Sequence, residues 1–314
     1  MSEAPDAFHC SPEEQLATNV GPAGIDIAYQ RTGGRHAPVV LLIMGVASQM
    51  IHWPEVFCRE LVERGLQVIR FDNRDAGHST HLSDSPVPNL PAALAGDLSS
   101  AAYTLSDMAA DAVGLLDALG IERAHVVGAS MGGQIAQVMA TESPGRVLSL
   151  TSMMSTTGGR TVGQTSPEAM RELFPGVPVA TREDYVQMYL LVMQVVGSPA
   201  YPSDETEVAE VAGRAFDRSY DLAAMTRQAV ATVASGDRTE QLRQLSVPAL
   251  VIHGVADRMC EVSGGRATAA AIASAELVLI DGMGHNLPPG LRSRLAGHIA
   301  DFVWRVERGR ERPQ

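Results

Sequence analysis

The chain has 314 residues, with 24 Lys+Arg against 36 Asp+Glu and a formal net charge of −12. Every lysine or arginine position is an arginine, which excludes mechanisms built on a lysine amine, such as Schiff-base chemistry and the P-loop. The acidic balance, with no basic run before residues 305–312, argues against a nucleic-acid partner. The length allows one large domain or a domain with an insertion.

No apolar stretch approaches the ~20 residues that cross a bilayer, so no membrane association is expected. Residues 1–24 contain acidic side chains and no apolar core of a secretory signal, which predicts a cytoplasmic protein. The cysteines Cys10, Cys58 and Cys260 are too few and too scattered for a disulfide framework or a zinc site. We expect no metal and no cofactor, and the residues leave a homo-oligomer open.

The first half of the chain alternates between strand and helix patterns. Residues 1–24 are predicted to be a polar N-terminal arm, and residues 84–100, rich in Pro, Ser and Ala, a loop. The patterns predict strands at 25–29, 38–44, 67–71 and 124–127, and helices at 54–63, 105–119 and 134–141. The run PVVLLIM at 38–44 is continuously apolar, as in a fully buried parallel strand.

The second half repeats the alternation after one long interruption. Strands are predicted at 147–153, 247–252 and 277–280, and a final helix at 291–306. The whole pattern predicts an α/β fold, a mostly parallel sheet with helices on both faces. Residues 155–243 show helical patterns only, so we expect a helical cap there, with ordinary packing helices as the alternative. The predicted core is therefore 25–154 and 244–314.

Gly128, Ser130 and Gly132 match the pattern G-x-S-x-G between a predicted strand and a predicted helix. The sharp turn needs small neighbours and holds the serine out of the sheet, so Ser130 is the candidate nucleophile. The alternative is a glycine-rich turn whose serine has no catalytic role.

A serine nucleophile needs a base and a carboxylate that orients the base. Asp257 and His285 each lie just past the end of a predicted strand, at the edge where open α/β sheets place their sites. Asp281 is the rival for the acid. Of the other histidines, we expect His125 to be a packing residue, and His78 and His81 to be solvated.

The order Ser130, Asp257, His285 resembles that of the α/β-hydrolases. The segments LLIMGVASQMIHW, HVVGASMGG and GMGHNLP look most like the aclacinomycin methylesterase branch of carboxylic ester hydrolases. The resemblance covers nearly the whole chain after the arm. It implies a Ser-His-Asp triad, an acyl-enzyme intermediate and a small-molecule ester substrate. Residues 72–79 (DNRDAGHS) are similar to the family's D-x-R-x-x-G-x-S loop, which implies a structural role.

The tetrahedral intermediate of ester hydrolysis carries an oxyanion that needs two amide donors. Met131, directly after Ser130, supplies the first by position. Residues 44–46 stand where the family usually has His-Gly-x, which implies the Val46 amide as the second donor. This chain departs from the pattern in having Met44, which removes a polar side chain that often braces the loop.

Several methionines fall near the predicted site loops and in the predicted cap. One interpretation is that these methionines only fill the hydrophobic core, because methionine packs well into irregular gaps. The sharper hypothesis is a deformable apolar pocket for a bulky or medium-chain ester, with Trp53 near its rim. The candidate pocket residues are Gly45, Trp53, Met154, Met188 and Met283.

Other functions remain open on the same triad: a lactonase, a C–C bond hydrolase or a cofactor-free perhydrolase. A non-catalytic ligand receptor would also keep these residues. The serine itself argues against epoxide hydrolases and dehalogenases, which use an aspartate nucleophile. The absence of lysine excludes a Ser-Lys mechanism, so deprotonation of Ser130 is expected to depend on His285.

Overall fold

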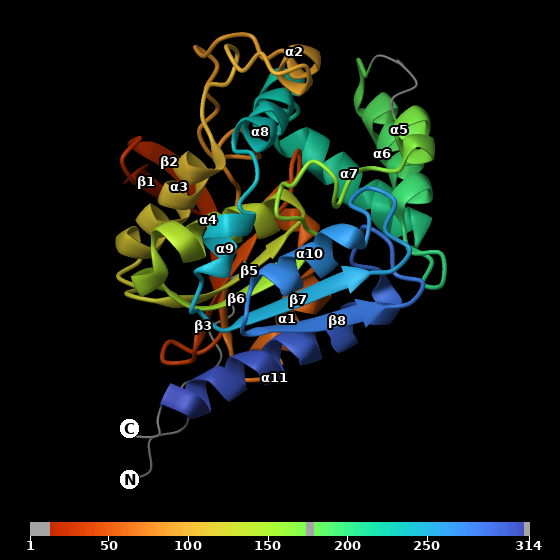
Figure 1. Cartoon of the computed structure of the whole chain (residues 1–314). Coiled ribbons are helices and arrows are strands. Elements are labelled where there is room, and N and C mark those ends of the chain that lie inside the picture. Colours follow the sequence, from red (N-terminus) through yellow and green to blue (C-terminus); the bar gives the residue numbers. More distant parts are fainter. Residues whose placement is uncertain (1–12, 174–178, 311–314) are drawn as a thin grey trace.

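The structure is a computed structural model that describes residues 13–173 and 179–310. Its strands form one sheet in the order β1-β2-β4-β3-β5-β6-β7-β8 (Figure 1). β1 and β2 are antiparallel, as are β2 and β4, and all later neighbours are parallel. The strands are β1 (Gln15–Val20), β2 (Ile25–Thr32), β3 (Val39–Ile43), β4 (Gln67–Phe71), β5 (Ala124–Ala129), β6 (Val147–Met153), β7 (Ala249–Gly254) and β8 (Ala275–Ile280).

Helices cover both faces of the sheet, as the sequence predicts. The side chains of β3 alternate between the faces, Leu41 packing with α3 and α4, and Leu42 with α1 and α11. The helices outside the cap interval are α1 (Glu55–Glu63), α2 (Leu90–Leu94), α3 (Leu105–Ala118), α4 (Met131–Glu142), α10 (Ser263–Ala271) and α11 (Arg292–Arg310). Short 3-10 helices are η1 (Met50–His52), η2 (Pro144–Arg146) and η3 (Pro289–Leu291).

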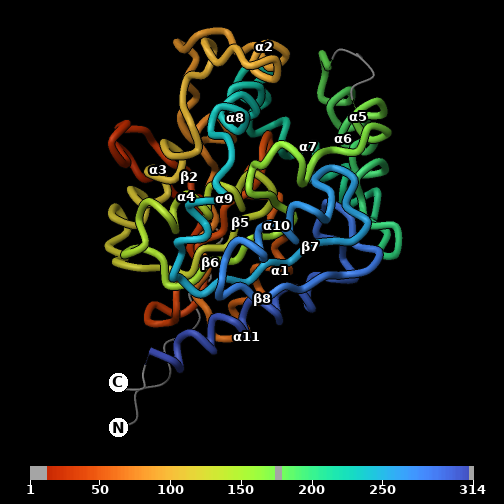
Figure 2. The backbone as a smooth tube through the Cα atoms, viewed as in Figure 1, coloured from red at the N-terminus to blue at the C-terminus, as the bar shows by residue number. Residues whose placement is uncertain are grey.

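Residues 155–243, which we call the cap segment, are helical between β6 and β7. The described part of this interval contains no strand, and its helices are α5 (Pro167–Leu173), α6 (Arg182–Val196), α7 (Glu205–Arg218), α8 (Leu222–Ala234) and α9 (Thr239–Arg243). Figure 1 shows α5 to α8 grouped above the sheet and α11 below it. In Figure 2 the backbone of α2 lies beside α8, which it contacts. The boundaries of core and cap stay predictions.

Two segments differ from the sequence predictions. Residues 15–20 of the predicted arm form β1, an edge strand whose side chains are mostly exposed, so no apolar alternation marked it. The predicted loop at 84–100 contains α2, a helix of 5 residues capped by the Asn89 side chain. Residues 1–12 of the arm, with Cys10, lie outside the described residues, while Cys58 and Cys260 are free and buried.

Candidate active site

Ser130 lies on the turn between β5 and α4 with a strained backbone. Its φ of 56° and ψ of −123° are rare for a residue with a side chain. The glycines on either side permit the turn: a Cβ on Gly128 would lie 2.0 Å from the Gly132 carbonyl oxygen, and one on Gly132 would lie 2.0 Å from that of Ile43. The Ser130 amide donates to the Met153 carbonyl at 2.9 Å, which fixes the turn against β6.

His285 and Asp257 reach Ser130 from the loops after β8 and β7. His285 Nδ1 lies 2.7 Å from Asp257 Oδ2, and Nε2 lies 3.0 Å from Ser130 Oγ. An ionised carboxylate only accepts hydrogen bonds, so His285 Nδ1 donates to Asp257 and Nε2 accepts from the Ser130 hydroxyl. The three predicted catalytic residues therefore form one hydrogen-bonded chain in the order that nucleophilic catalysis needs.

The Asp257 carboxylate is buried and held ionised. Its Oδ1 accepts from the amides of Met259 at 2.9 Å and Cys260 at 2.8 Å. Burial raises the pKa of Asp257, but the charge of His285 and hydrogen bonds from His253, His285 and the Cys260 amide outweigh burial and lower it to about 2. The rival Asp281 is exposed, and His285 Nδ1 faces Asp257 instead.

His253 is a neighbour of the triad that sequence reasoning did not assign. It is fully buried, with Nε2 at 2.7 Å from the Cys260 carbonyl oxygen and 3.4 Å from Asp257 Oδ2. The ring packs against Gly265, where an added Cβ would lie 2.4 Å from Nδ1. Its place at the end of β7 was visible in the sequence, but nothing in the pattern indicated a contact with an aspartate further along the chain.

The histidine loop is also tied to the cap segment. The His285 amide donates to the Val196 carbonyl, the last of α6, at 2.7 Å, and the Gly284 amide donates to Ser198 Oγ at 2.9 Å. A Cβ on Gly284 would lie 2.2 Å from the Gly197 carbonyl oxygen, so only glycine fits this crossing. The C-terminal end of α6 is therefore fixed directly beside His285.

The predicted oxyanion donors flank the nucleophile. A Cβ added to Gly45 would lie 3.0 Å from Ser130 Cβ and 3.4 Å from its Oγ, which places the loop of Val46 against the serine. Met131 is the first residue of α4, where helix amides have no partner within the helix and the helix dipole favours negative charge. In the described ranges, neither the Val46 amide nor the Met131 amide donates to another protein group.

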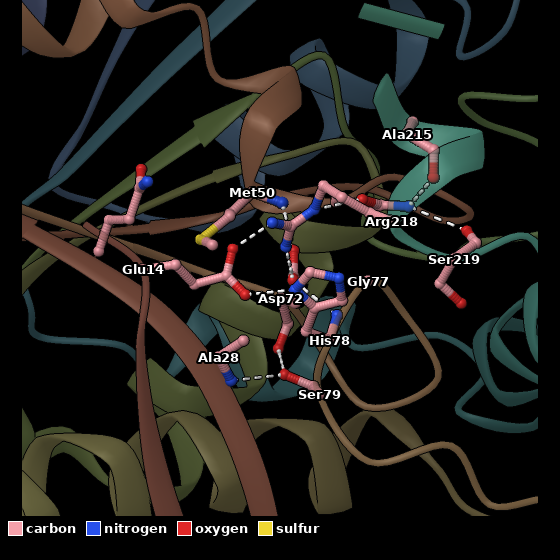
Figure 3. Close-up of polar contacts among 12 residues, drawn as sticks. Glu14, Ala28, Met50, Asp72, Gly77, His78, Ser79, Ala215, Arg218 and Ser219 are labelled. Atoms are coloured by element: carbon pink, nitrogen blue, oxygen red, sulfur yellow. Dashed lines mark hydrogen bonds and ion pairs between the residues drawn. The ribbon is translucent and has the colours of Figure 1, made fainter. Parts of the chain in front are cut away.

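Residues 72–79, predicted to be structural, connect the core to the cap segment and to the start of β1. Figure 3 shows the Asp72 carboxylate between the Met50 amide, which donates to it at 2.7 Å, and the guanidinium of Arg218 from α7. Arg218 also pairs with Glu14, and Glu14 with His78. Burial raises the pKa of Asp72, although Arg218 and two amides oppose it.

Of the other histidines, His125 has the packing role that the sequence predicts. It is fully buried and packs with its Nδ1 2.8 Å from Ser149 Oγ. His78 and His81 were expected to be solvated, which is confirmed for His78, whose side chain is 48% exposed, and wrong for His81, which is half-buried against the cap segment. His78 pairs with Glu14, and His81 Nε2 lies 3.2 Å from the Ser219 hydroxyl oxygen of the cap segment.

The predicted pocket residues fall into different environments. Trp53 and Met283 are 0% exposed in the cluster that packs α1 and α11 against the sheet, so the prediction of Trp53 at a pocket rim is wrong. Its indole stacks on Phe57 at 5.5 Å, and a large aromatic beside a site loop serves a core as readily as a rim. Met154 is buried directly after β6, and Met188 is half-buried on α6. Gly45 alone is placed against Ser130.

Within the described ranges, no group of three His, Cys, Asp or Glu side chains is arranged to hold a metal ion. Nor does that part of the chain contain a helix long and apolar enough to cross a membrane.

Comparison with known proteins places this geometry in a family. A family model described as the alpha/beta hydrolase fold matches residues 38–288. The chain is 28% identical to the rhodomycin D methylesterase DauP of Streptomyces sp. (strain C5), over 84% of this chain and 89% of the relative. It is 29% identical to the rhodomycin D methylesterase DnrP of Streptomyces peucetius, with the same coverage of 84% and 89%.

Solved structures share the same architecture. A thermophilic esterase from Thermogutta terrifontis superposes with a TM-score of 0.71 at 24% identity, covering 94% of this chain and 99% of the other. The enol-lactonase from Burkholderia xenovorans LB400 superposes with a TM-score of 0.69 at 23% identity, covering 92% and 100%. At these identities the likeness concerns the fold.

Proposed function

The chain belongs to the alpha/beta hydrolase family, and from that premise we propose that it is a serine hydrolase of carboxylic esters. The observation that carries the proposal is the hydrogen-bonded chain from Asp257 through His285 to Ser130, with distances of 2.7 and 3.0 Å. The methylesterase relatives, which match along 84% of the chain, support the same bond type.

The geometry supports a two-step reaction. Ser130 Oγ attacks the ester carbonyl carbon while His285 Nε2 takes the hydroxyl proton, and the carbonyl electrons move to the oxygen. The Val46 and Met131 amides donate to this oxyanion. Collapse of the intermediate expels the alcohol, which takes the proton from His285 and leaves the acyl group on Ser130. Water then attacks, its proton passing to His285, and the second collapse releases the carboxylic acid and restores Ser130.

The apolar side chains of the cap segment favour a bulky apolar substrate. Residues 188–193 of α6 (MYLLVM) are all apolar or aromatic and all half-buried, so this stretch presents apolar surface around the whole helix. The same helix ends at Val196, whose carbonyl accepts a hydrogen bond from the His285 amide. We propose that this stretch contacts the hydrophobic part of the ester, and that the leaving group is methanol, as the names of the methylesterase relatives indicate.

The central test compares the wild type with Ser130→Ala on p-nitrophenyl esters from acetate to octanoate. We expect loss of turnover with unchanged circular dichroism, and labelling of the wild type by a fluorophosphonate at Ser130. Ser106→Ala is the matched control, because its hydroxyl bonds to Glu142 at the far end of α4. Undiminished activity of Ser130→Ala would overturn the proposal. Labelling without any turnover would instead favour a ligand receptor.

The substrate class has its own test, in which methyl esters of aliphatic and polycyclic acids are assayed by methanol release. We expect kcat/KM to rise with the apolar size of the acid. A steep preference for acetyl esters of small alcohols would contradict the apolar site. Lactones and a vinylogous diketone belong in the same panel, because lactonases and C–C bond hydrolases would use the same serine.

A further inference from the structure

We propose that Gln228, on helix α8 of the cap segment, is the positioning residue of the loop that carries the second oxyanion donor. The proposal rests on the proposed function, since it concerns the Val46 amide. The sequence leaves open which group holds this loop, because the chain has Met44 where related loops usually have a polar side chain. Met44 packs into an apolar cluster and is 8% exposed, so its side chain cannot brace the loop by hydrogen bonds.

Two neighbouring residues of the core hold only the ends of this loop. Asn73 Nδ2 donates to the Met44 carbonyl at 3.0 Å. Asp72 Oδ1 accepts from the Met50 amide at 2.7 Å, as Figure 3 shows. Between these points the chain makes a tight turn, in which the Ser48 amide donates to the Gly45 carbonyl at 3.3 Å. The two central residues of the turn are Val46 and Ala47, and in the part of the chain that the structure describes no core residue outside the turn hydrogen-bonds to them.

The middle of the turn is its strained part. Ala47 has a φ of 58° at the third position of the turn, where a positive value is ordinary for glycine and costs a residue with a side chain about 1 kcal/mol or more. The peptide that joins Val46 to Ala47 can relieve this strain by rotating, which would also shift the neighbouring Val46 amide. A partner for the Ala47 amide is therefore what keeps the donor in place.

Gln228 is that partner. Its Oε1 accepts from the Ala47 amide at 2.8 Å, and its Nε2 donates to the Arg74 carbonyl at 2.7 Å. The side chain is 0% exposed, and reversing its amide would set donor against donor and acceptor against acceptor. The two bonds thus fix one orientation of the glutamine, and through it one orientation of the peptide after Val46.

Helix α8 is anchored firmly enough for this role. The preceding residue, Arg227, makes two hydrogen bonds to the buried Asp75 carboxylate, at 2.9 and 2.7 Å. Asp75 also accepts from the Tyr103 hydroxyl at 2.7 Å. Asp75 belongs to the same loop as Arg74. We call residues 45–48 the oxyanion turn, and it therefore moves as one unit with Gln228 and the loop after β4. The oxyanion site is therefore complete only with the cap segment docked.

The experiment compares Gln228→Met with Gln67→Met. Gln67 is a matched control: it is 2% exposed, accepts from Arg31 Nε at 3.0 Å, donates to the Gly34 carbonyl at 2.7 Å, and begins β4 at the opposite edge of the sheet from Ser130. Gln228→Met should lower kcat about ten- to a hundredfold with KM nearly unchanged, as expected for a small displacement of a catalytic group. Gln67→Met should cost comparable thermal stability and leave kcat unchanged.

A second readout isolates the oxyanion. A trifluoromethyl ketone forms a hemiketal oxyanion with Ser130, so Gln228→Met should weaken its inhibition by the same factor as kcat. Gln228→Glu keeps an acceptor for Ala47, and a carboxyl that this buried site keeps protonated can still donate to the Arg74 carbonyl, so this variant is expected to retain most of kcat. An unchanged kcat in Gln228→Met, or an equal loss in Gln67→Met or Gln228→Glu, would overturn the proposal while the ester hydrolase stands. A wild type without turnover and without Ser130 labelling would overturn both.

Discussion

The two halves of the candidate site are held in different ways. The predicted triad is held by the ends of three parallel strands: Ser130 follows β5, Asp257 follows β7 and His285 follows β8. The oxyanion turn is held by side chains from distant segments, since Ala47 and Gln228 are 181 positions apart. On the proposed mechanism, the sheet therefore fixes the proton relay, whereas docking of the cap segment fixes the turn that carries the proposed oxyanion donor.

The largest expected effect tests the half that the sheet holds. Asp257→Asn would present an amide to His285 Nδ1 and favour the wrong tautomer, so we expect kcat to fall about 10⁴-fold with the fold intact. Initial rates and circular dichroism measure this. Asp281→Asn is the control, because this exposed carboxylate lies beside the same loop and should leave kcat unchanged. A large loss in that control would reverse the assignment of the acid.

This difference explains what the sequence could predict. That Ser130, His285 and Asp257 would lie together was readable because each follows an apolar strand pattern, and parallel strands bring their ends to one edge. Gln228 carried no signal, because a neutral glutamine within a helix belongs to no motif and its partners are backbone groups far away in the chain. The environment of Trp53 was predicted wrongly because a tryptophan side chain suits a buried core as well as a pocket rim. β1 was missed because an edge strand needs only backbone pairing on one side.

The second prediction tests the joint between α8 and the core. The Arg227 and Asp75 side chains are 3% and 0% exposed, so Arg227→Met would leave a buried carboxylate without its cationic partner. We expect the free energy of unfolding to fall by about 3–5 kcal/mol in urea denaturation. Arg182→Met removes a pair whose side chains are 51% and 57% exposed, and should cost at most about 1 kcal/mol. Equal costs would show that this joint is no stronger than a surface pair.

The third prediction tests the contact between the two halves. Gly45→Ala would bring a Cβ to 3.0 Å from Ser130 Cβ and 3.3 Å from the Ala129 carbonyl oxygen, so the turn must shift by a few tenths of an ångström. We expect kcat to fall about tenfold without unfolding, because small misplacements at a catalytic centre are costly. Gly297→Ala, where a Cβ meets nothing within 4 Å on α11, should keep kcat. Normal activity of Gly45→Ala would mean that the halves are not in close contact during turnover.

The fourth prediction separates the two halves of the site by their response to acid. Burial lowers the pKa of His52 to about 4, while its hydrogen bonding with Gln49 opposes this and Arg218 and Arg214 add to it. Because the pKa in the unfolded chain is about 6.5, neutral His52 contributes its full stability above that pH and loses it as the pH falls toward 4. Asp257, with a pKa of about 2, stays ionised throughout this range.

Between pH 7 and pH 5 the His52 contribution should therefore fall by about 2 kcal/mol. His52→Phe removes this titration and keeps a ring against Tyr189, whose centroid lies 5.5 Å from that of His52. Urea denaturation at the two pH values should show a loss of stability that is smaller in the variant by that amount, whereas the exposed His36→Gln should behave like the wild type. His52 lies in η1, which directly follows the oxyanion turn. If His52→Phe lost as much stability between pH 7 and pH 5 as the wild type, His52 would not be the source of acid sensitivity in that half of the site.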